Sequence, residues 1–108
     1  MPYTVFLTDD AARDLEDVYD HIDLHDVPGK AGHVLEQIEK TFNSLSEYPH
    51  RGTYPKELLA IGLQEYREVF FKPYRIIYRV VDNNIFVLLI VDGRRDMQTL
   101  LQQRLLQA

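Results

Sequence analysis

The stretch YRIIYRVVDNNIFVLLIV, residues 74–91, decides the fold of this chain. Residues 74–81 are rich in β-branched and aromatic side chains, which is typical of a strand. Asp82-Asn83-Asn84 predicts a tight turn, because Asn and Asp tolerate positive φ. Residues 85–91 are apolar at every position and predict a strand covered on both faces. We therefore expect a hairpin whose second strand is the central strand of a sheet.

Two helices are predicted upstream of this hairpin. Thr8 is a suitable N-cap for a helix over residues 9–25, whose apolar residues recur at helical spacing. Asp26 as an N-cap, with Pro28 in the first turn, predicts the start of a second helix, which ends near Tyr48-Pro49. Because the connection is short, the two helices should form an antiparallel hairpin.

The remaining segments complete an α+β domain of order β-α-α-β-β-β-α. Residues 3–7 and 65–71 predict two more strands, and Pro73 separates the second of these from the hairpin. Glycines and prolines make residues 49–63 a loop with one helical turn near residues 57–61. We expect one domain, residues 1–108, with a helical hairpin packed on a mainly antiparallel four-stranded sheet. Its parts are a strand plus helical hairpin over 1–48, a three-stranded antiparallel sheet over 64–92, and a C-terminal helix over 97–107.

Composition excludes several classes of protein. The chain of 108 residues has no cysteine, which rules out disulfide staples, thiol catalysis and cysteine-based zinc sites. No signal-peptide pattern is visible at the N-terminus, and the longest apolar run is too short to cross a bilayer. We expect a cytoplasmic protein without a membrane partner.

The charge is unevenly distributed along the chain. The net charge is −5, and residues 1–48 contain eleven acidic and three basic residues, whereas residues 64–95 contain six basic and four acidic ones. An acidic total argues against a protein that works mainly by neutralising phosphates, although it leaves room for a local basic cleft.

Arginines of the C-terminal half are the most informative candidates for a site. Side chains alternate along a strand, so Arg75 and Arg79 should share one face, while Arg67 lies on the neighbouring strand. Arg94 and Arg95 follow the central strand directly. Guanidinium groups bind phosphates and carboxylates in a bidentate manner, and we expect several of these to converge at one end of the sheet. The alternative for Arg67, Arg75 and Arg79 is internal pairing with acidic residues.

Other candidate constellations are weaker. His21 and His25 share a helix face and could share a metal ion, but no third ligand is identified and a solvated pair explains them better. The acidic residues of the first helix could do acid–base chemistry, but a solvated helix face accounts for them. Glycine-rich phosphate loops and metalloprotease motifs are missing from the sequence. We expect neither a metal nor a cofactor.

Four segments resemble the RelE/ParE superfamily of bacterial toxins from type II toxin–antitoxin pairs. They are Tyr48–Gly52, Arg67–Val69, Tyr74–Val80 and Ile90–Asp96, in that order and spacing. The resemblance covers nearly the whole chain and implies the same fold. RelE-like members are ribosome-dependent endoribonucleases that cut mRNA, whereas ParE-like members inhibit DNA gyrase.

Carrying the RelE-like catalytic residues over favours the ParE-like branch. Arg75 and Arg95 fall on arginines that the family uses. Tyr66 and Glu68 stand where RelE-like enzymes place lysines, and Leu101 stands where they place a tyrosine. RNA cleavage needs a group that takes a proton and cations that stabilise the charged phosphorane. The departures at these three positions remove such groups.

The resemblance therefore implies a ParE-like inhibitor of DNA gyrase rather than an enzyme. The alternatives are a RelE-like mRNA endoribonuclease, in which Arg75 and Arg95 would handle phosphate, and a degenerate, non-toxic binding partner. Binding of the target or antitoxin would use the five arginines named above: Arg67, Arg75, Arg79, Arg94 and Arg95.

Partners are also implied by the resemblance. A cognate antitoxin, encoded by the adjacent gene, would cover the helical hairpin and the basic edge of the sheet. Operator DNA would be bound only through that antitoxin. The acidic hairpin would complement a basic stretch of the antitoxin and speed association.

Overall fold

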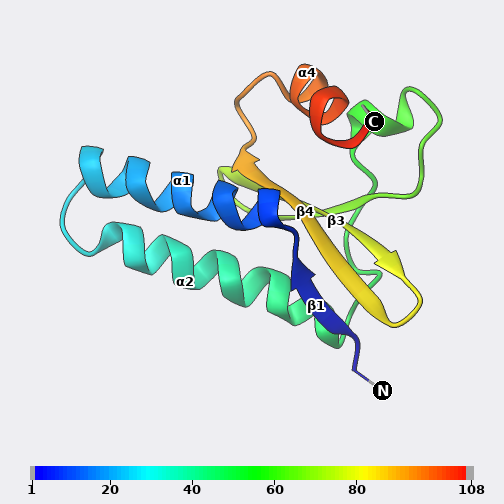
Figure 1. Cartoon of the computed structure of the whole chain (residues 1–108), viewed down its shortest axis with the longest axis horizontal. Coiled ribbons are helices and arrows are strands. Elements are labelled where there is room, and N and C mark those ends of the chain that lie inside the picture. The colour runs from blue at the N-terminus through cyan, green and yellow to red at the C-terminus, as the bar shows by residue number, and fades with distance from the viewer. Residues whose placement is uncertain (1, 107–108) are drawn as a thin grey trace.

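The computed structural model describes residues 2–106, which form four strands and a set of helices (Figure 1). The strands are β1 (Thr4–Leu7), β2 (Arg67–Phe71), β3 (Tyr74–Val81) and β4 (Asn84–Asp92). The helices are α1 (Asp9–His25), α2 (Lys30–Asn43), a 3₁₀ turn η1 (Ser44–Ser46), α3 (Lys56–Leu59), α4 (Met97–Leu101) and a π-helical turn η2 (Gln102–Leu106). The predicted α+β class is confirmed. The predicted C-terminal helix is present as α4 and η2, and its last position lies outside the described residues.

One mixed sheet of order β1-β4-β3-β2 forms the centre of the molecule. The β2–β3 and β3–β4 pairs are antiparallel and β1 runs parallel to β4. The run from residue 85 to 91 thus lies inside the sheet, as its continuous apolar sequence predicts. Asp82 adopts a φ of 54° in the β3–β4 turn, a conformation that Asp tolerates better than most residues.

The helical hairpin of α1 and α2 covers one face of the sheet. Thr8 caps α1 as predicted, its hydroxyl accepting a hydrogen bond of 3.1 Å from the Ala11 amide. The prediction that Asp26 is the N-cap of α2 is wrong, because Asp26 is the C-cap of α1 and Gly29 is the N-cap of α2. Gly29 has a φ of 89°, a left-handed conformation that only glycine adopts without strain.

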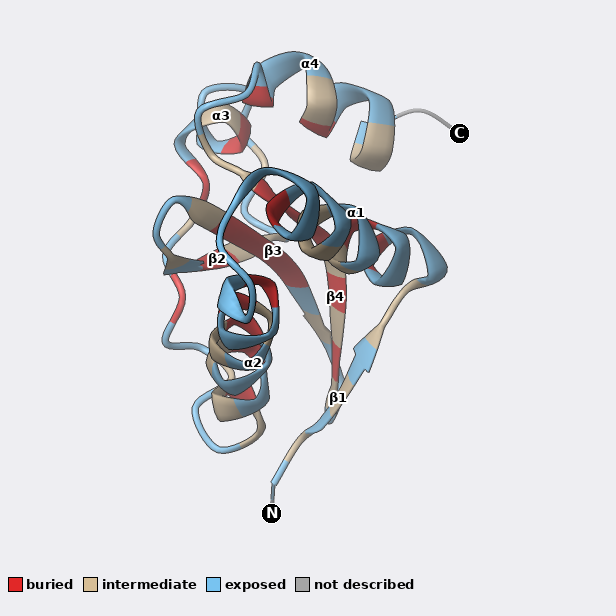
Figure 2. Ribbon diagram, turned by 90° about the vertical axis from the view of Figure 1, so that its left-hand side faces the viewer, coloured by how far each residue is buried: buried red, intermediate tan, exposed pale blue. Residues whose placement is uncertain are grey.

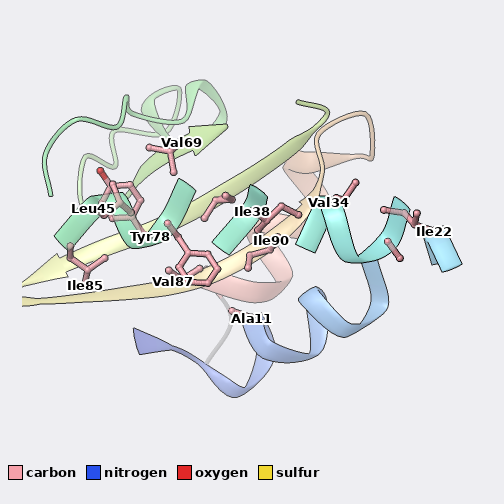
Figure 3. Packing of buried hydrophobic residues seen from close by; sticks show 13 residues of the cluster. Ala11, Ile22, Val34, Ile38, Leu45, Val69, Tyr78, Ile85, Val87 and Ile90 are labelled. Atoms are coloured by element: carbon pink, nitrogen blue, oxygen red, sulfur yellow. The ribbon is translucent and has the colours of Figure 1, made fainter. Parts of the chain in front are cut away.

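The main core lies between this hairpin and the sheet (Figure 3). Buried apolar residues from both helices meet residues of β2, β3 and β4, and Figure 3 labels ten of the cluster: Ala11, Ile22, Val34, Ile38, Leu45, Val69, Tyr78, Ile85, Val87 and Ile90. The Tyr78 hydroxyl donates to the Pro49 carbonyl oxygen at 2.7 Å and accepts from the Gly52 amide at 3.1 Å, so its burial leaves no polar group unsatisfied.

A smaller core covers part of the opposite face of the sheet. Ile77, Leu89 and Val91 pack there against α3 and α4, which lie together at the other side of the sheet from α2 (Figures 1 and 2). A β-bulge between Ile77 and Tyr78 sets this arrangement. Ile77 pairs with Leu89 and Tyr78 with Val87, so Leu88 is an extra residue and the facing of β4 residues reverses after it. Within residues 2–106, no helix is long and apolar enough to cross a membrane.

Candidate functional site

Arg75, predicted as a binding residue, is buried in an internal ion-pair network. Its Nε donates to Glu68 at 2.7 Å, and its two terminal nitrogens donate to the two carboxylate oxygens of Glu57 at 2.8 and 2.7 Å. Only 8% of Arg75 is exposed. Three of the five N–H donors of Arg75 therefore bind carboxylates within the chain, and the contact with Glu57 links α3 to the sheet.

Within this network, the pKa of Glu57 and the pKa of Glu68 are shifted in opposite directions. Hydrogen bonds from Arg75 lower the pKa of Glu57 below its ordinary value. Burial raises the pKa of Glu68, and the hydrogen bond from Arg75 opposes this only in part. The guanidinium of Arg75 has its pKa raised by Glu57 first and Glu68 second. It therefore carries a permanent charge that is compensated inside the protein.

Gly93 is required next to this network. A Cβ added at Gly93 would lie 2.7 Å from Arg75 Cδ and 3.2 Å from the Pro73 carbonyl oxygen. The glycine of the Gly93–Asp96 segment thus lets the chain pass directly over the aliphatic stem of Arg75.

Arg94 and Arg95 lie at the end of β4, and their environments differ. Arg94 donates from its backbone amide and its guanidinium to the carboxylate of Asp92, and this contact lowers the pKa of Asp92. Arg95 is exposed, and among the described residues no carboxylate lies within 4.0 Å of its guanidinium. Of the two predicted binding residues at this end, Arg95 is the one whose charge is open to a ligand.

A groove of about 490 Å³ runs beside these two arginines. One wall comes from α1, with Asp17 and His21, and the other comes from the start of β3 and the end of β4, with Tyr74 and Asp92. Burial, followed by the nearby charge of Asp92, raises the pKa of Tyr74, so its phenol stays protonated at neutral pH. The groove combines hydrogen-bonding groups of both charges and suits a polypeptide surface better than a phosphate backbone.

Arg67 and Arg79 lie at the opposite end of β3 from this groove. Arg67 pairs with Tyr78 in the register, and Arg79 is the next residue, whereas Asp92 pairs with Tyr74 at the other end of the strand. The expectation that several arginines converge at one end of the sheet is therefore met by Arg75, Arg94 and Arg95 and is wrong for Arg67 and Arg79. β3 is eight residues long, so its two ends lie on opposite sides of the sheet.

Asp14 and Arg104 form a second ion pair that the sequence did not reveal. The two side chains make a bidentate contact, with nitrogen–oxygen distances of 3.0 and 2.9 Å. Asp14 also accepts from the Ile90 amide at 3.1 Å, and Arg104 donates to the Leu88 carbonyl oxygen at 3.1 Å. The reading of all α1 acids as a solvated face is thus wrong for Asp14, which is 9% exposed.

This ion pair closes an edge of the sheet. β1 pairs with β4 only as far as Val87, and beyond that residue no strand among residues 2–106 lies on this edge of β4. Asp14 and Arg104 supply the acceptor and donor that a strand would have supplied. A signal for Asp14 exists in the sequence, because it falls on the apolar stripe of α1 between Ala11 and Val18.

Comparisons with known proteins agree with this fold. A family model described as "ParE toxin of type II toxin-antitoxin system, parDE" matches residues 5–97. A solved structure titled as a chromosomal ParDE system from P. aeruginosa is similar with a TM-score of 0.69 and 23% identity, covering 83% of this chain and 95% of that chain.

Two further solved structures are similar to the chain. One is from the toxin–antitoxin complex RelBE2 of Mycobacterium tuberculosis, with a TM-score of 0.60, 26% identity and coverage of 85% of this chain and 99% of that one. The other is a mutant of the E. coli toxin RelE in the free state, with a TM-score of 0.62, 16% identity and 92% coverage of both chains. No curated protein is significantly similar in sequence.

Proposed function

This chain belongs to the family of ParE toxins of type II toxin–antitoxin systems, and from this membership we propose that it inhibits DNA gyrase and is neutralised by a cognate antitoxin. The family match covers most of the chain, from residue 5 to residue 97. Binding to a protein target fits the acidic net charge of −5 better than binding to a nucleic acid.

The internal ion pairs of Arg75 are the main observation that supports a protein target over RNA cleavage. A RelE-like nuclease would need this guanidinium at the scissile phosphate, but here Glu57 and Glu68 already occupy it. Displacing them would leave two carboxylates partly buried without a counter-charge, which is costly. Leu101, at the position of the RelE-like tyrosine, is 1% exposed and belongs to the smaller core.

An mRNA endoribonuclease is the second candidate, and one observation favours it. Arg95 is exposed at a position that RelE-like enzymes use, so one cationic group remains open to phosphate. A single arginine can stabilise charge on a phosphorane but cannot take the proton of the attacking 2′-hydroxyl. The nuclease would therefore need a general base from elsewhere.

Antitoxin binding is supported by an apolar groove on the helical hairpin. The groove has a volume of about 560 Å³ and is lined by Leu7, Leu15, Tyr19 and Leu35, with acids beside them. We propose that an amphipathic segment of the antitoxin lies in this groove, its apolar face inward and its basic residues toward the acids. At the tip of the hairpin, Leu24 and Val27 are further exposed apolar residues, 79% and 64% exposed.

A supercoiling assay with purified gyrase tests the proposal. We expect the purified toxin to inhibit supercoiling and to increase cleaved DNA, and an excess of the antitoxin to reverse both effects. Primer extension on a translated mRNA, run with the same preparation, should show no toxin-dependent cuts. Cuts in the mRNA together with unaffected gyrase would reverse the order of the two candidates.

A further inference from the structure

A small polar pocket lies at the end of β3 that is far from Arg94 and Arg95. It has a volume of about 280 Å³ and is lined by His50, Gln64, Glu65, Arg67, Arg79 and Val80. β2 pairs with β3 only as far as the Arg67–Tyr78 pair, so residues 79–81 have β4 as a partner on one side and no described strand on the other. The pocket therefore combines a free strand edge with two guanidinium groups.

Arg67 is held in place by neutral groups only. Its guanidinium donates to the carbonyl oxygens of His50 and Gly52 at 3.2 and 2.9 Å and to the Tyr54 hydroxyl at 3.0 Å, and it lies 4.5 Å from the centre of the Tyr54 ring. Among residues 2–106, no carboxylate lies within 4.0 Å of it. A half-buried, rigidly held cation without a counter-charge is a preformed site for an anion.

Arg79 is the second cation of the pocket, and its ion pair with Glu65 is weak. Its guanidinium lies 3.6 Å from the Glu65 carboxylate, beyond hydrogen-bond distance, and the two side chains are 47% and 54% exposed. An exposed pair of this kind contributes little stability, so a better-placed carboxylate can displace Glu65.

We propose that this pocket binds an acidic side chain carried by an extended segment of a protein partner. Arg67 and Arg79 would bind the carboxylate, and the free edge of β3 would pair with the backbone of the segment. Three features favour a protein carboxylate over a nucleic-acid phosphate: the chain is acidic overall, Glu65 already places a carboxylate at Arg79, and a strand edge recognises a polypeptide backbone. The inference does not depend on gyrase being the target.

A titration followed by backbone amide NMR tests this inference with a defined probe. The probe is a blocked heptapeptide of β-forming residues with one central glutamate, and the matched control peptide has glutamine at that position. We expect the glutamate peptide to shift the Arg79 and Val80 amides and to bind about ten-fold tighter than the control peptide, since a hydrogen-bonded charge contributes on that scale. Inorganic phosphate is the third ligand tested.

Three variants make the result decisive. Arg79→Gln, which removes a charge on an exposed side chain, should weaken binding of the glutamate peptide about ten-fold. Glu65→Gln removes the competing carboxylate and should tighten it about three-fold. Arg94→Gln, the same charge change at the other end of the sheet, should have no effect.

Several outcomes would overturn the proposal. They are equal binding of the two peptides, no loss of affinity in Arg79→Gln, and no shift of the two amides at millimolar peptide. Binding of phosphate with Arg79-dependent affinity, without binding of the peptide, would instead assign the pocket to phosphate groups and would also overturn it.

Discussion

Arg75 and Arg95 both fall on arginine positions of the family that the sequence resembles, but their burial and their partners differ. Arg75 is 8% exposed and makes charged hydrogen bonds to two carboxylates, whereas Arg95 is exposed and has no carboxylate within 4.0 Å among the described residues. Two arginines at motif positions of one family can therefore have different roles. One guanidinium holds the domain together, and the other is free for a partner.

The largest expected effect comes from removing the internal arginine. Arg75→Ala should lower the free energy of unfolding by about 3–5 kcal/mol, because it leaves the carboxylates of Glu57 and Glu68 without their counter-charge. Urea unfolding followed by circular dichroism measures this change. Arg79→Ala is the control on the same strand, since its side chain is 47% exposed, and it should change the free energy by less than about 0.5 kcal/mol. Similar losses in both variants would refute the difference in role.

The ion pair of Asp14 and Arg104 allows a similar comparison, between an internal and an exposed charge, at the edge of the sheet. Asp14→Ala should lower the free energy of unfolding by about 1–3 kcal/mol, because the Ile90 amide loses its acceptor and Arg104 its partner. Asp17→Ala removes an exposed acid from the same helix and should have almost no effect. Amide hydrogen exchange should show faster exchange at Ile90 in Asp14→Ala alone. Unchanged protection of that amide would contradict the assigned hydrogen bond.

Most of the fold could be predicted from the sequence because it depends on local patterns. The apolar run of residues 85–91 placed β4 at the centre, and helical spacing gave α1 within the limits that the structure shows. The N-terminus of α2 was mispredicted at Asp26, which ends α1 instead. An Asp between two helices can cap either one, and which of the two it caps depends on the path of the connecting backbone. Gly29 adopts the left-handed conformation that resolves this choice.

The site was less predictable, because ion pairs between distant residues leave little trace in a single sequence. Arg75 and Glu57 are eighteen positions apart, and Asp14 and Arg104 are ninety positions apart. Neither pair follows from residue type or spacing. Ile77 and Tyr78 belong to different cores, as strand alternation requires, but which arginines lie near each other depends on the pairing register of the strands.

The dependence of the free energy of unfolding on acidic pH tests the Arg75 network through a smaller expected effect. Because the pKa of Glu57 is lowered in the folded state, its contribution is present above its ordinary pKa of 4.5 and is lost as the pH falls through the lower folded-state value. The pKa of Glu68 is raised, so its protonation favours the fold and opposes that loss. Glu57→Gln should therefore be less stable than the wild type at neutral pH and approach it in acid.

Urea midpoints measured between about pH 7 and about pH 3 check this expectation. Glu65→Gln, which changes an exposed carboxyl, serves as the control and should run parallel to the wild type. A constant difference between Glu57→Gln and the wild type over the whole range would show that the pKa of Glu57 is not lowered by folding.

The smallest expected change in stability belongs to Arg95, and it comes with the clearest expected change in function. Arg95→Ala should alter the free energy of unfolding by less than about 0.5 kcal/mol, because the side chain is exposed and has no described ion-pair partner. If Arg95 contacts the target, the same change should weaken inhibition of gyrase about ten-fold or more, as loss of an arginine at the centre of an interface does.

Arg94→Ala is the matched control, since the two arginines are adjacent and the charge change is identical. The guanidinium of Arg94 is held by Asp92, so it is less free to bind a partner, and its removal should weaken inhibition less than the Arg95 change. Equal losses in the two variants would mean that only the total charge of this end of the sheet matters. Full activity in Arg95→Ala would move the target contact away from the groove and would leave the pocket of Arg67 and Arg79 as the open basic site.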